Sequence, residues 1–249
     1  MKIQQLTPGF ALHVSSDWDA LCSAAADLTL RALETKPNLL MCAAAGQSTT
    51  KFYRQVHRRS LERPEAFQRL RVVALDEWAG LPPGDPATCH AYLKEHLVAP
   101  LKLGPERYMP WRSEAPIPWE ETARMQTWLG AEGPIDLCIL GLGINGHLGL
   151  NEPGDALIPH AHVAALTAES RRHAMLAQAA NSPAIGYTFG MADLLASRLI
   201  ILLVHGVPKA PALAGLLRQE ITTSLPASCL WLHQSVSCFC DQAAFQDAL

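Results

Sequence analysis

The chain has 249 residues, 49% hydrophobic and 17% charged, which is enough to bury the core of one large α/β domain. A formal net charge of -3, with the charges scattered, excludes the basic stripe typical of nucleic-acid binding. Because no signal segment opens the chain and no apolar run reaches membrane-spanning length, we expect a cytoplasmic protein without membrane or nucleic-acid partners.

The first third of the chain alternates helical and apolar patterns. Residues 16–19 (SDWD) resemble a capping box with Asp in place of Glu or Gln, and the helix that follows ends at Lys36-Pro37. The wholly apolar run 39–45 (LLMCAAA) predicts a strand, and 49–61 predicts a helix. A second buried strand is expected at 71–77 (RVVALDE), with a helix from about Thr88.

The remaining elements continue this alternation. A Pro-rich connection at 105–118 precedes a predicted helix at 119–130 and a strand at 135–140 (IDLCIL), which runs into the glycine-rich stretch 141–154 (GLGINGHLGLNEPG). Later come the most apolar strand, a helix and two final strands, at 198–206, 208–219, 229–233 (CLWLH) and 236–240 (VSCFC).

Strands that are apolar at nearly every residue are expected where helices cover both faces of a parallel sheet. The alternation therefore predicts an α/β fold with an open, mainly parallel, doubly wound sheet, formed as a single domain over 1–249. Residues 105–118 and 153–165 are candidate mobile loops, and the stretch near 153–180 is a candidate lid.

Cysteines and paired histidines are the residues to weigh for disulfides or a metal site. Seven cysteines make an odd count, and Cys42, Cys138 and Cys229 lie inside apolar runs, as small buried hydrophobic side chains do. The pair Cys238 and Cys240, and the HAH triplet at 160–162, lack further ligands at a matching spacing. We therefore expect reduced cysteines and no metal.

Polar clusters follow several of the predicted strands, where ligands gather in open parallel sheets. They are AGQST (45–49), LDEW (75–78), the stretch from 141, and HGVPK with Lys209. The turn at 45–49 opens a helix, so its free N–H groups and the Ser48 hydroxyl would suit a phosphate, although an ordinary strand–helix turn has the same pattern. A bound anion would also explain Lys209 at a helix start; a solvated lysine is the alternative.

Acids and a histidine in these clusters are candidate catalytic groups. Asp76 and Glu77 are adjacent in a strand and so point to opposite faces; one could act as a base while the other caps the next loop. His147 has glycines on both sides and Glu152 five residues later, which allows an imidazole–carboxylate contact. A Ser-His-Asp hydrolase is poorly supported because no G-x-S-x-G elbow occurs.

The motifs LDEW, GLGINGHLGLNEPG and PASCLWLH resemble the amino-sugar-phosphate deaminase/isomerase family, typified by glucosamine-6-phosphate deaminase, over nearly the whole chain. LDEW, the pair Thr88-Cys89 and DLCILGLGINGHLGLNEPG are more similar to the galactosamine-6-phosphate branch. The resemblance implies a three-layer α/β/α sandwich, a small-molecule amino sugar phosphate as substrate, and no metal or organic cofactor. Galactosamine 6-phosphate would be converted to tagatose 6-phosphate and ammonia.

The resemblance also implies roles for individual residues. Asp76 would shuttle the proton, and His147 would open the sugar ring with support from Glu152 and Asn145. The phosphate would be held by Gly46, Gln47, Ser48, Arg171 and Lys209.

This chain departs from the family pattern at two places. Asn145 stands where many members have aspartate, and an amide can orient His147 but cannot raise its basicity as a carboxylate would. Gln47-Ser48-Thr49 replaces the usual small residue, threonine and proline, which affects the phosphate turn.

Other functions compatible with these residues are glucosamine-6-phosphate deaminase, 6-phosphogluconolactonase and a non-catalytic sugar-phosphate sensor. The lactonase hypothesis does not explain the run Asn151-Glu152-Pro153. The sensor hypothesis does not explain why Asp76, His147 and Glu152 are all present. The short tail after the final strand favours a monomer or a small homo-oligomer.

Overall fold

The computed structural model describes residues 1–246 and has a central mainly parallel sheet. The strand order is β1-β2-β11-β10-β7-β3-β4-β6, and every neighbouring pair is parallel except β1 with β2. The strands are β1 (Lys2–Thr7), β2 (Phe10–Ser15), β3 (Leu40–Ala43), β4 (Arg71–Ala74), β6 (Tyr108–Met109), β7 (Leu137–Gly141), β10 (Leu199–Val204) and β11 (Val236–Asp241).

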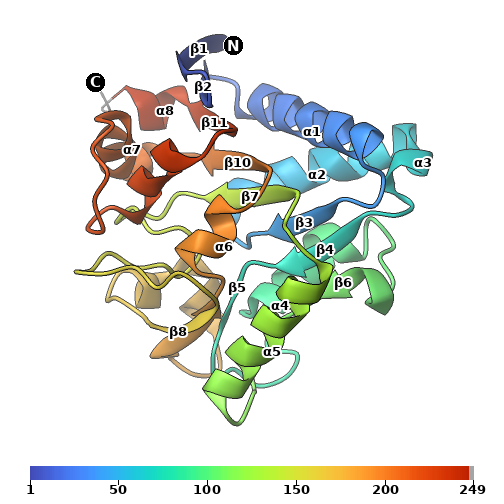
Figure 1. Ribbon diagram of the computed structural model, residues 1–249, viewed down its shortest axis with the longest axis vertical. Coiled ribbons are helices and arrows are strands. Elements are labelled where there is room, and N and C mark those ends of the chain that lie inside the picture. The colour runs from blue at the N-terminus through green and yellow to red at the C-terminus, as the bar shows by residue number, and fades with distance from the viewer. Residues whose placement is uncertain (247–249) are drawn as a thin grey trace.

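Helices connect these strands on both sides of the sheet, which confirms the predicted three-layer α/β/α fold (Figure 1). From β2 to β4 the chain crosses the sheet in one direction, and from β6 to β11 it crosses in the other. Because such crossovers are right-handed, the helices of the two paths cover opposite faces of the sheet. The helices are α1 (Trp18–Thr35), α2 (Gln47–Glu62), α3 (Pro64–Phe67), α4 (Cys89–Leu93), α5 (Pro118–Glu132), α6 (Met191–Leu195), α7 (Ala210–Leu217) and α8 (Gln242–Phe245).

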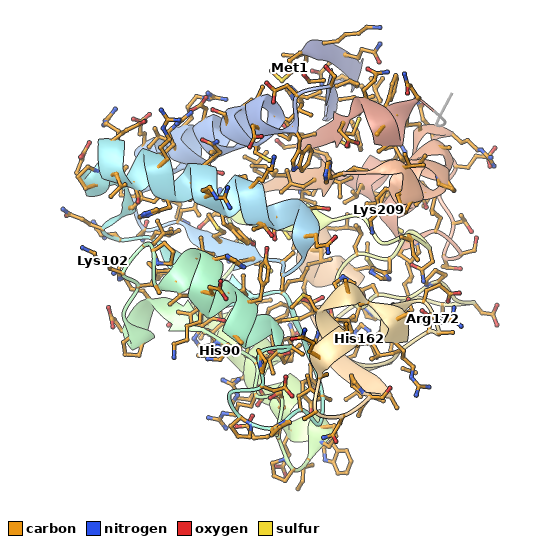
Figure 2. The ribbon with its side chains drawn as sticks, turned by 180° about the vertical axis from the view of Figure 1, so that it is seen from behind. Met1, His90, Lys102, His162, Arg172 and Lys209 are labelled. Carbon is orange, nitrogen blue, oxygen red and sulfur yellow. The ribbon has the colours of Figure 1, made fainter. Side chains whose placement is uncertain are left out.

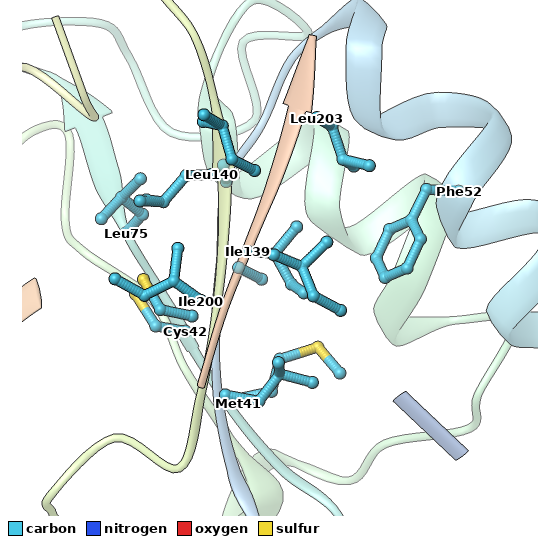
Figure 3. Packing of buried hydrophobic residues seen from close by; sticks show 14 of the residues in the cluster. Met41, Cys42, Phe52, Leu75, Ile139, Leu140, Ile200 and Leu203 are labelled. Carbon is cyan, nitrogen blue, oxygen red and sulfur yellow. The ribbon is translucent and has the colours of Figure 1, made fainter. Parts of the chain in front are cut away.

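The central strands are buried on both faces. Every residue of β3 is buried, and β10 is buried from Ile200 to Val204. Figure 3 shows Phe52 of α2 beside aliphatic side chains of these strands, including Ile139 and Leu203. A continuous apolar run is the sequence signature of such a strand, so these elements were the easiest to predict.

A second, antiparallel sheet of three strands has the order β5-β9-β8. It consists of β5 (Asp76–Trp78), β8 (His162–Ala165) and β9 (Ile185–Thr188). The single strand expected at 71–77 is therefore wrong, because it divides at Leu75. Leu75 N donates to Ala43 O of the main sheet, whereas Leu75 O accepts from Phe189 N beside β9. The chain thus changes sheets at the residue before Asp76.

The strand expected at 229–233 is also wrong. Residues Pro226–Leu232 form a 3₁₀ helix, η6, in which Leu230 is fully buried and Trp231 Nε1 donates to Leu216 O at 2.7 Å. Both edges of β10 are already paired, with β7 and β11. Because neither edge of β10 is free, this apolar segment satisfies its backbone N–H groups in a tight helix and, at Ala227 N, through Gly146 O at 2.9 Å.

Other boundaries differ in smaller ways. The N-cap of α1 is Asp17, whose Oδ1 accepts from Ala20 N at 3.0 Å, one residue later than the capping box at 16–19 indicated. The connection 105–118 contains β6, and its Trp111 is buried with Nε1 donating to Ala74 O at 2.9 Å. The hairpin of β1 and β2, the strands β8 and β9 and the helix α6 were not predicted. Within residues 1–246, no helix is both long and apolar enough to span a bilayer.

Candidate active site

The turn at Gly46 and the glycine-rich stretch 141–154 flank the point where the sheet reverses its winding. From β3 the chain moves to β4 and then β6 on one side, and from β7 it moves to β10 and β11 on the other. Such a switch point leaves a crevice at the carboxyl ends of the two adjacent strands. The turn at Gly46 follows β3 and the stretch 141–154 follows β7, so residues 90 or more positions apart meet at one edge.

Asp76 is the first residue of the small sheet, directly beyond the carboxyl end of β4. Its Oδ1 is sealed from solvent and has no hydrogen-bond partner in residues 1–246. Burial raises the pKa of Asp76 to about 7. An unpaired carboxylate that titrates near neutral pH is suited to accept and return a proton.

Glu77, on the opposite face of β5, has a different environment. Its carboxylate accepts from the backbone N–H groups of Trp78, Cys89 and His90, each at 2.8 Å. These bonds fix the start of α4 against β5. The prediction that one of the two acids orients the next loop is confirmed for Glu77, and Asp76 is the acid left without a partner.

His147 and Glu152 contact each other as the sequence predicted. His147 Nδ1 lies 3.4 Å from Glu152 Oε2, and the two side chains are 17% and 9% exposed. Burial would raise the pKa of Glu152, but hydrogen bonds with His147, Ser170 and Asn145 outweigh it and lower the pKa to about 2. Glu152 is therefore an anion at neutral pH, able to stabilise a proton on the imidazole.

Asn145 supports Glu152 and not the imidazole ring. Its Nδ2 donates to Glu152 Oε2 at 3.0 Å, and its Oδ1 accepts from the backbone N of His147 at 3.2 Å. The expectation that the amide orients the histidine side chain directly is thus corrected. The amide holds the loop backbone and the carboxylate that faces the ring.

Two hydroxyl residues of a distant segment join this pair, and no motif in the sequence singled out either of them. Ser170 Oγ lies 3.3 Å from His147 Nδ1, and Thr167 Oγ1 donates to Glu152 Oε2 at 3.3 Å. Thr167 Oγ1 also accepts from Ser170 N at 3.2 Å. The only sequence signal was the placement of hydroxyls beside the basic run at 171–172, which is weak without the fold.

Glycine is required at two positions of the 141–154 loop. A side chain on Gly143 would collide with the His147 imidazole, which lies flat against it. Gly146 has a φ of 85° and packs against Leu225 of the segment before η6. The glycines therefore set the position of His147 between the end of β7 and the chain near η6.

The predicted anion turn begins at Gly46, whose φ of 143° is a conformation that favours glycine. Gly46 O accepts from Tyr92 Oη at 2.7 Å, and α2 starts at Gln47 with no side-chain cap. The Gln47 and Ser48 side chains make no hydrogen bond within residues 1–246. This first turn of α2 follows the carboxyl end of β3, and β3 pairs with β7, the strand before the loop that carries His147.

Lys209 is half-buried at the start of α7, after the 3₁₀ turn η5 (Val207–Lys209) that follows β10. Burial lowers its pKa, and no acidic side chain within residues 1–246 pairs with it. A desolvated cation at a helix N-terminus is unfavourable unless an anion joins it. Arg171 lies in the 3₁₀ helix η3 (Ser170–Arg172), is exposed, and forms no ion pair within residues 1–246; its predicted role stays a prediction.

The segment that carries η3 and β8 lies on the same side of the molecule as Lys209. In the view of Figure 2, Arg172, His162 and Lys209 lie on one side of the molecule and Lys102 on the opposite side. His162 Nδ1 donates to His160 O at 2.8 Å, and His160 Nδ1 lies 2.9 Å from Asp193. Among residues 1–246, no group of three or more His, Cys, Asp or Glu side chains is placed to hold a metal ion.

Together these residues are candidates for two separate proton-transfer groups and for an anion site. Asp76 can move a proton between neighbouring carbons, and His147 with Glu152 can move one at an oxygen. Lys209 and the first turn of α2 can bind a phosphate, which would hold a small substrate across the crevice.

The chain is similar to known proteins over nearly its whole length. Residues 16–238 match the family model described as glucosamine-6-phosphate isomerases/6-phosphogluconolactonase. The chain is 36% identical to the protein named "Putative deaminase AgaI" of Escherichia coli (strain K12), with 95% of this chain and 94% of that one covered. The solved structure of a monomeric glucosamine-6-phosphate deaminase superposes with a TM-score of 0.90 at 30% identity, covering 94% and 98% of the two chains.

The 6-phosphogluconolactonase of Leishmania guyanensis has the same fold, with a TM-score of 0.77 at 16% identity over 96% of this chain and 98% of that one. The protein therefore belongs to the glucosamine-6-phosphate isomerase/6-phosphogluconolactonase family. Its higher identity to the deaminases makes it an enzyme on the deaminase side of that family.

Proposed function

We propose that the protein converts galactosamine 6-phosphate and water to tagatose 6-phosphate and ammonia. One observation carries this proposal: three kinds of group follow the carboxyl ends of neighbouring strands of one sheet. They are the unpaired Asp76 carboxylate, the His147–Glu152 pair and the unpaired Lys209. An isomerising deamination needs a base for C2, a separate proton-transfer group for ring opening and a phosphate anchor. The relatives that are 30% to 36% identical are named deaminases.

In the proposed mechanism His147 transfers a proton between the anomeric hydroxyl and the ring oxygen, which opens the sugar. Asp76 then removes the proton from C2 of the open chain and returns it to C1. The resulting ketimine adds water at C2, and the C–N bond breaks to release ammonia. Glu152 stabilises the imidazolium formed during ring opening, because it stays ionised at neutral pH.

The choice of galactosamine 6-phosphate as the substrate rests on residues of β5 and of the start of α4. Trp78 and Cys89 belong to one buried cluster, and Thr88 caps α4 through its Oγ1, which accepts from Ala91 N at 3.0 Å. These are the residues through which the sequence resembles the galactosamine-6-phosphate branch. They adjoin β5 and so can shape the crevice near the sugar carbons.

Glucosamine 6-phosphate is the second candidate substrate. The solved structure with a TM-score of 0.90 is a glucosamine-6-phosphate deaminase, and the two substrates differ only in the configuration at C4. The assay is ammonia release and ketose phosphate formation by the purified protein with each epimer, without added metal. We expect a higher kcat/KM for the galacto epimer.

Preferential turnover of the gluco epimer would overturn the galacto assignment and keep the deaminase. Turnover of 6-phosphogluconolactone alone would overturn the deaminase itself. The cytoplasmic location and the role of residues 153–180 as a lid stay predictions.

A further inference from the structure

His173 stands beside the proposed site on the segment that the catalytic assignment leaves out. It follows η3 and precedes the 3₁₀ helix η4 (Ala174–Gln178). His173 N donates to Ser170 O at 3.1 Å, so the two residues span one 3₁₀ turn. Side chains three residues apart in such a turn project in the same direction, and Ser170 Oγ lies 3.3 Å from His147 Nδ1.

The imidazole of His173 also lies next to Trp78, with ring centroids 5.7 Å apart. Trp78 is two residues after Asp76 in β5, and side chains two apart in a strand share a face. His173 is therefore placed between the face of β5 that carries Asp76 and the turn that contacts His147.

The two ring nitrogens of His173 have different surroundings. Nδ1 accepts a hydrogen bond from Met175 N at 3.3 Å, because a backbone N–H can only donate. In the neutral ring the proton then resides on Nε2. Nε2 makes no hydrogen bond within residues 1–246 and is not among the buried polar atoms, so it is an open donor.

The charge environment keeps this ring neutral. Burial, and after it the charges of His147 and Lys209, lower the pKa of His173 to about 4. His173 therefore lies within electrostatic range of both the proposed ring-opening histidine and the proposed phosphate lysine.

We propose that His173 is a substrate-binding residue whose Nε2–H donates a hydrogen bond to a hydroxyl of the open amino sugar phosphate, between the reacting carbons and the phosphate. This inference rests on the proposed function. It assigns to the 166–178 segment a direct contact with substrate, in addition to the support that Thr167 and Ser170 give to Glu152 and His147.

Two substitutions distinguish the proposed contact of Nε2–H with substrate from the role of Nδ1 in capping η4. His173→Asn places an amide oxygen where Nδ1 accepts from Met175 N but removes the distal donor. His173→Gln places an amide N–H near the position of Nε2 but loses the cap. We expect His173→Asn to lower kcat/KM about 10-fold at an unchanged melting temperature, as for one lost hydrogen bond to substrate. His173→Gln should retain most of kcat/KM and melt at a lower temperature.

A matched control is His57→Asn, in which another partly buried histidine, in the C-terminal half of α2, is changed. It should leave kcat/KM within about 2-fold of the parent. If His173→Asn has parental kcat/KM, or if His173→Gln is the more impaired of the two, His173 only caps η4 and the inference is overturned. Turnover by the parent protein tests the proposed function independently of both variants.

Discussion

At the scale of single residues, Asp76 and its neighbour Glu77 are both buried acids, but they have different hydrogen-bond partners. Glu77 accepts three backbone hydrogen bonds, whereas Asp76 Oδ1 has none. We expect Asp76→Asn to bind substrate while losing exchange of the C2 proton with solvent, because the amide cannot accept that proton. Exchange followed by NMR in deuterated water checks this. Persistent exchange would place the base at another residue.

The raised pKa of Asp76 also makes stability depend on pH. A carboxyl group whose pKa is about 7 in the folded state and about 3.8 in the unfolded state favours folding less as pH rises between these values. Asp76→Asn should therefore raise the melting temperature at pH 8, raise it less at pH 5, and leave it nearly unchanged at pH 4. Thermal unfolding at the three values checks the trend. An equal shift at all three would contradict the pKa assignment.

Because residue 145 is an asparagine, the His147–Glu152 pair has no second carboxylate beside it. Asn145→Asp would remove the Nδ2–H that Glu152 Oε2 accepts and put two acids about 3 Å apart. Two such acids share a proton, which raises the pKa of the pair. We expect the acid limb of the kcat–pH profile to move to higher pH. A profile with an unmoved acid limb would show that residue 145 does not affect the ionisation of Glu152.

At the scale of elements, the stretch 153–180 consists of short pieces. Outside β8 it contains only η3 and η4, of three and five residues, and much of it is exposed. Its side chains nonetheless reach the site, through Thr167 and Ser170. Segments with little regular structure open at low free-energy cost, so this stretch is suited to act as a lid.

We expect ligand binding to slow amide hydrogen exchange across 166–178, because a bound sugar phosphate would add contacts to this segment. Hydrogen exchange measured by mass spectrometry, with and without the ketose phosphate product, checks this prediction. Strand β10, which is buried from Ile200 to Val204, should exchange slowly in both samples and serves as the internal control. Equal protection of 166–178 in both samples would argue against a lid.

At the scale of the whole molecule, the relative with a TM-score of 0.90 is described as monomeric. The edge strands here are β1, which is exposed, and the two-residue β6. The two residues of β6 offer little backbone for pairing between copies, whereas the six-residue β1 leaves one longer edge unpaired. We expect light scattering to give the mass of a monomer or a small homo-oligomer of the 27.0 kDa chain. A hexamer would contradict this expectation.

The sequence alone determined the elements whose signal is local. Wholly apolar runs identified β3, β7 and β10, and the glycines, His147 and Glu152 of 141–154 lie close enough along the chain for their contact to be expected. The apolar run at 229–233 shows the limit of this reasoning, because strand and helix are distinguished there only by whether a neighbouring strand edge is free.

The tertiary structure alone decided which distant residues meet. Ser170 reaches His147, and His173 reaches Trp78, across 23 and 95 positions of sequence, through short turns that have no hydrophobic period of their own. The division at Leu75 and the desolvation of Asp76 likewise depend on β9, which pairs with β5 from more than 100 residues away. Periodicity in a sequence reports burial along one element, whereas the pKa and partners of a site residue depend on every element packed around it.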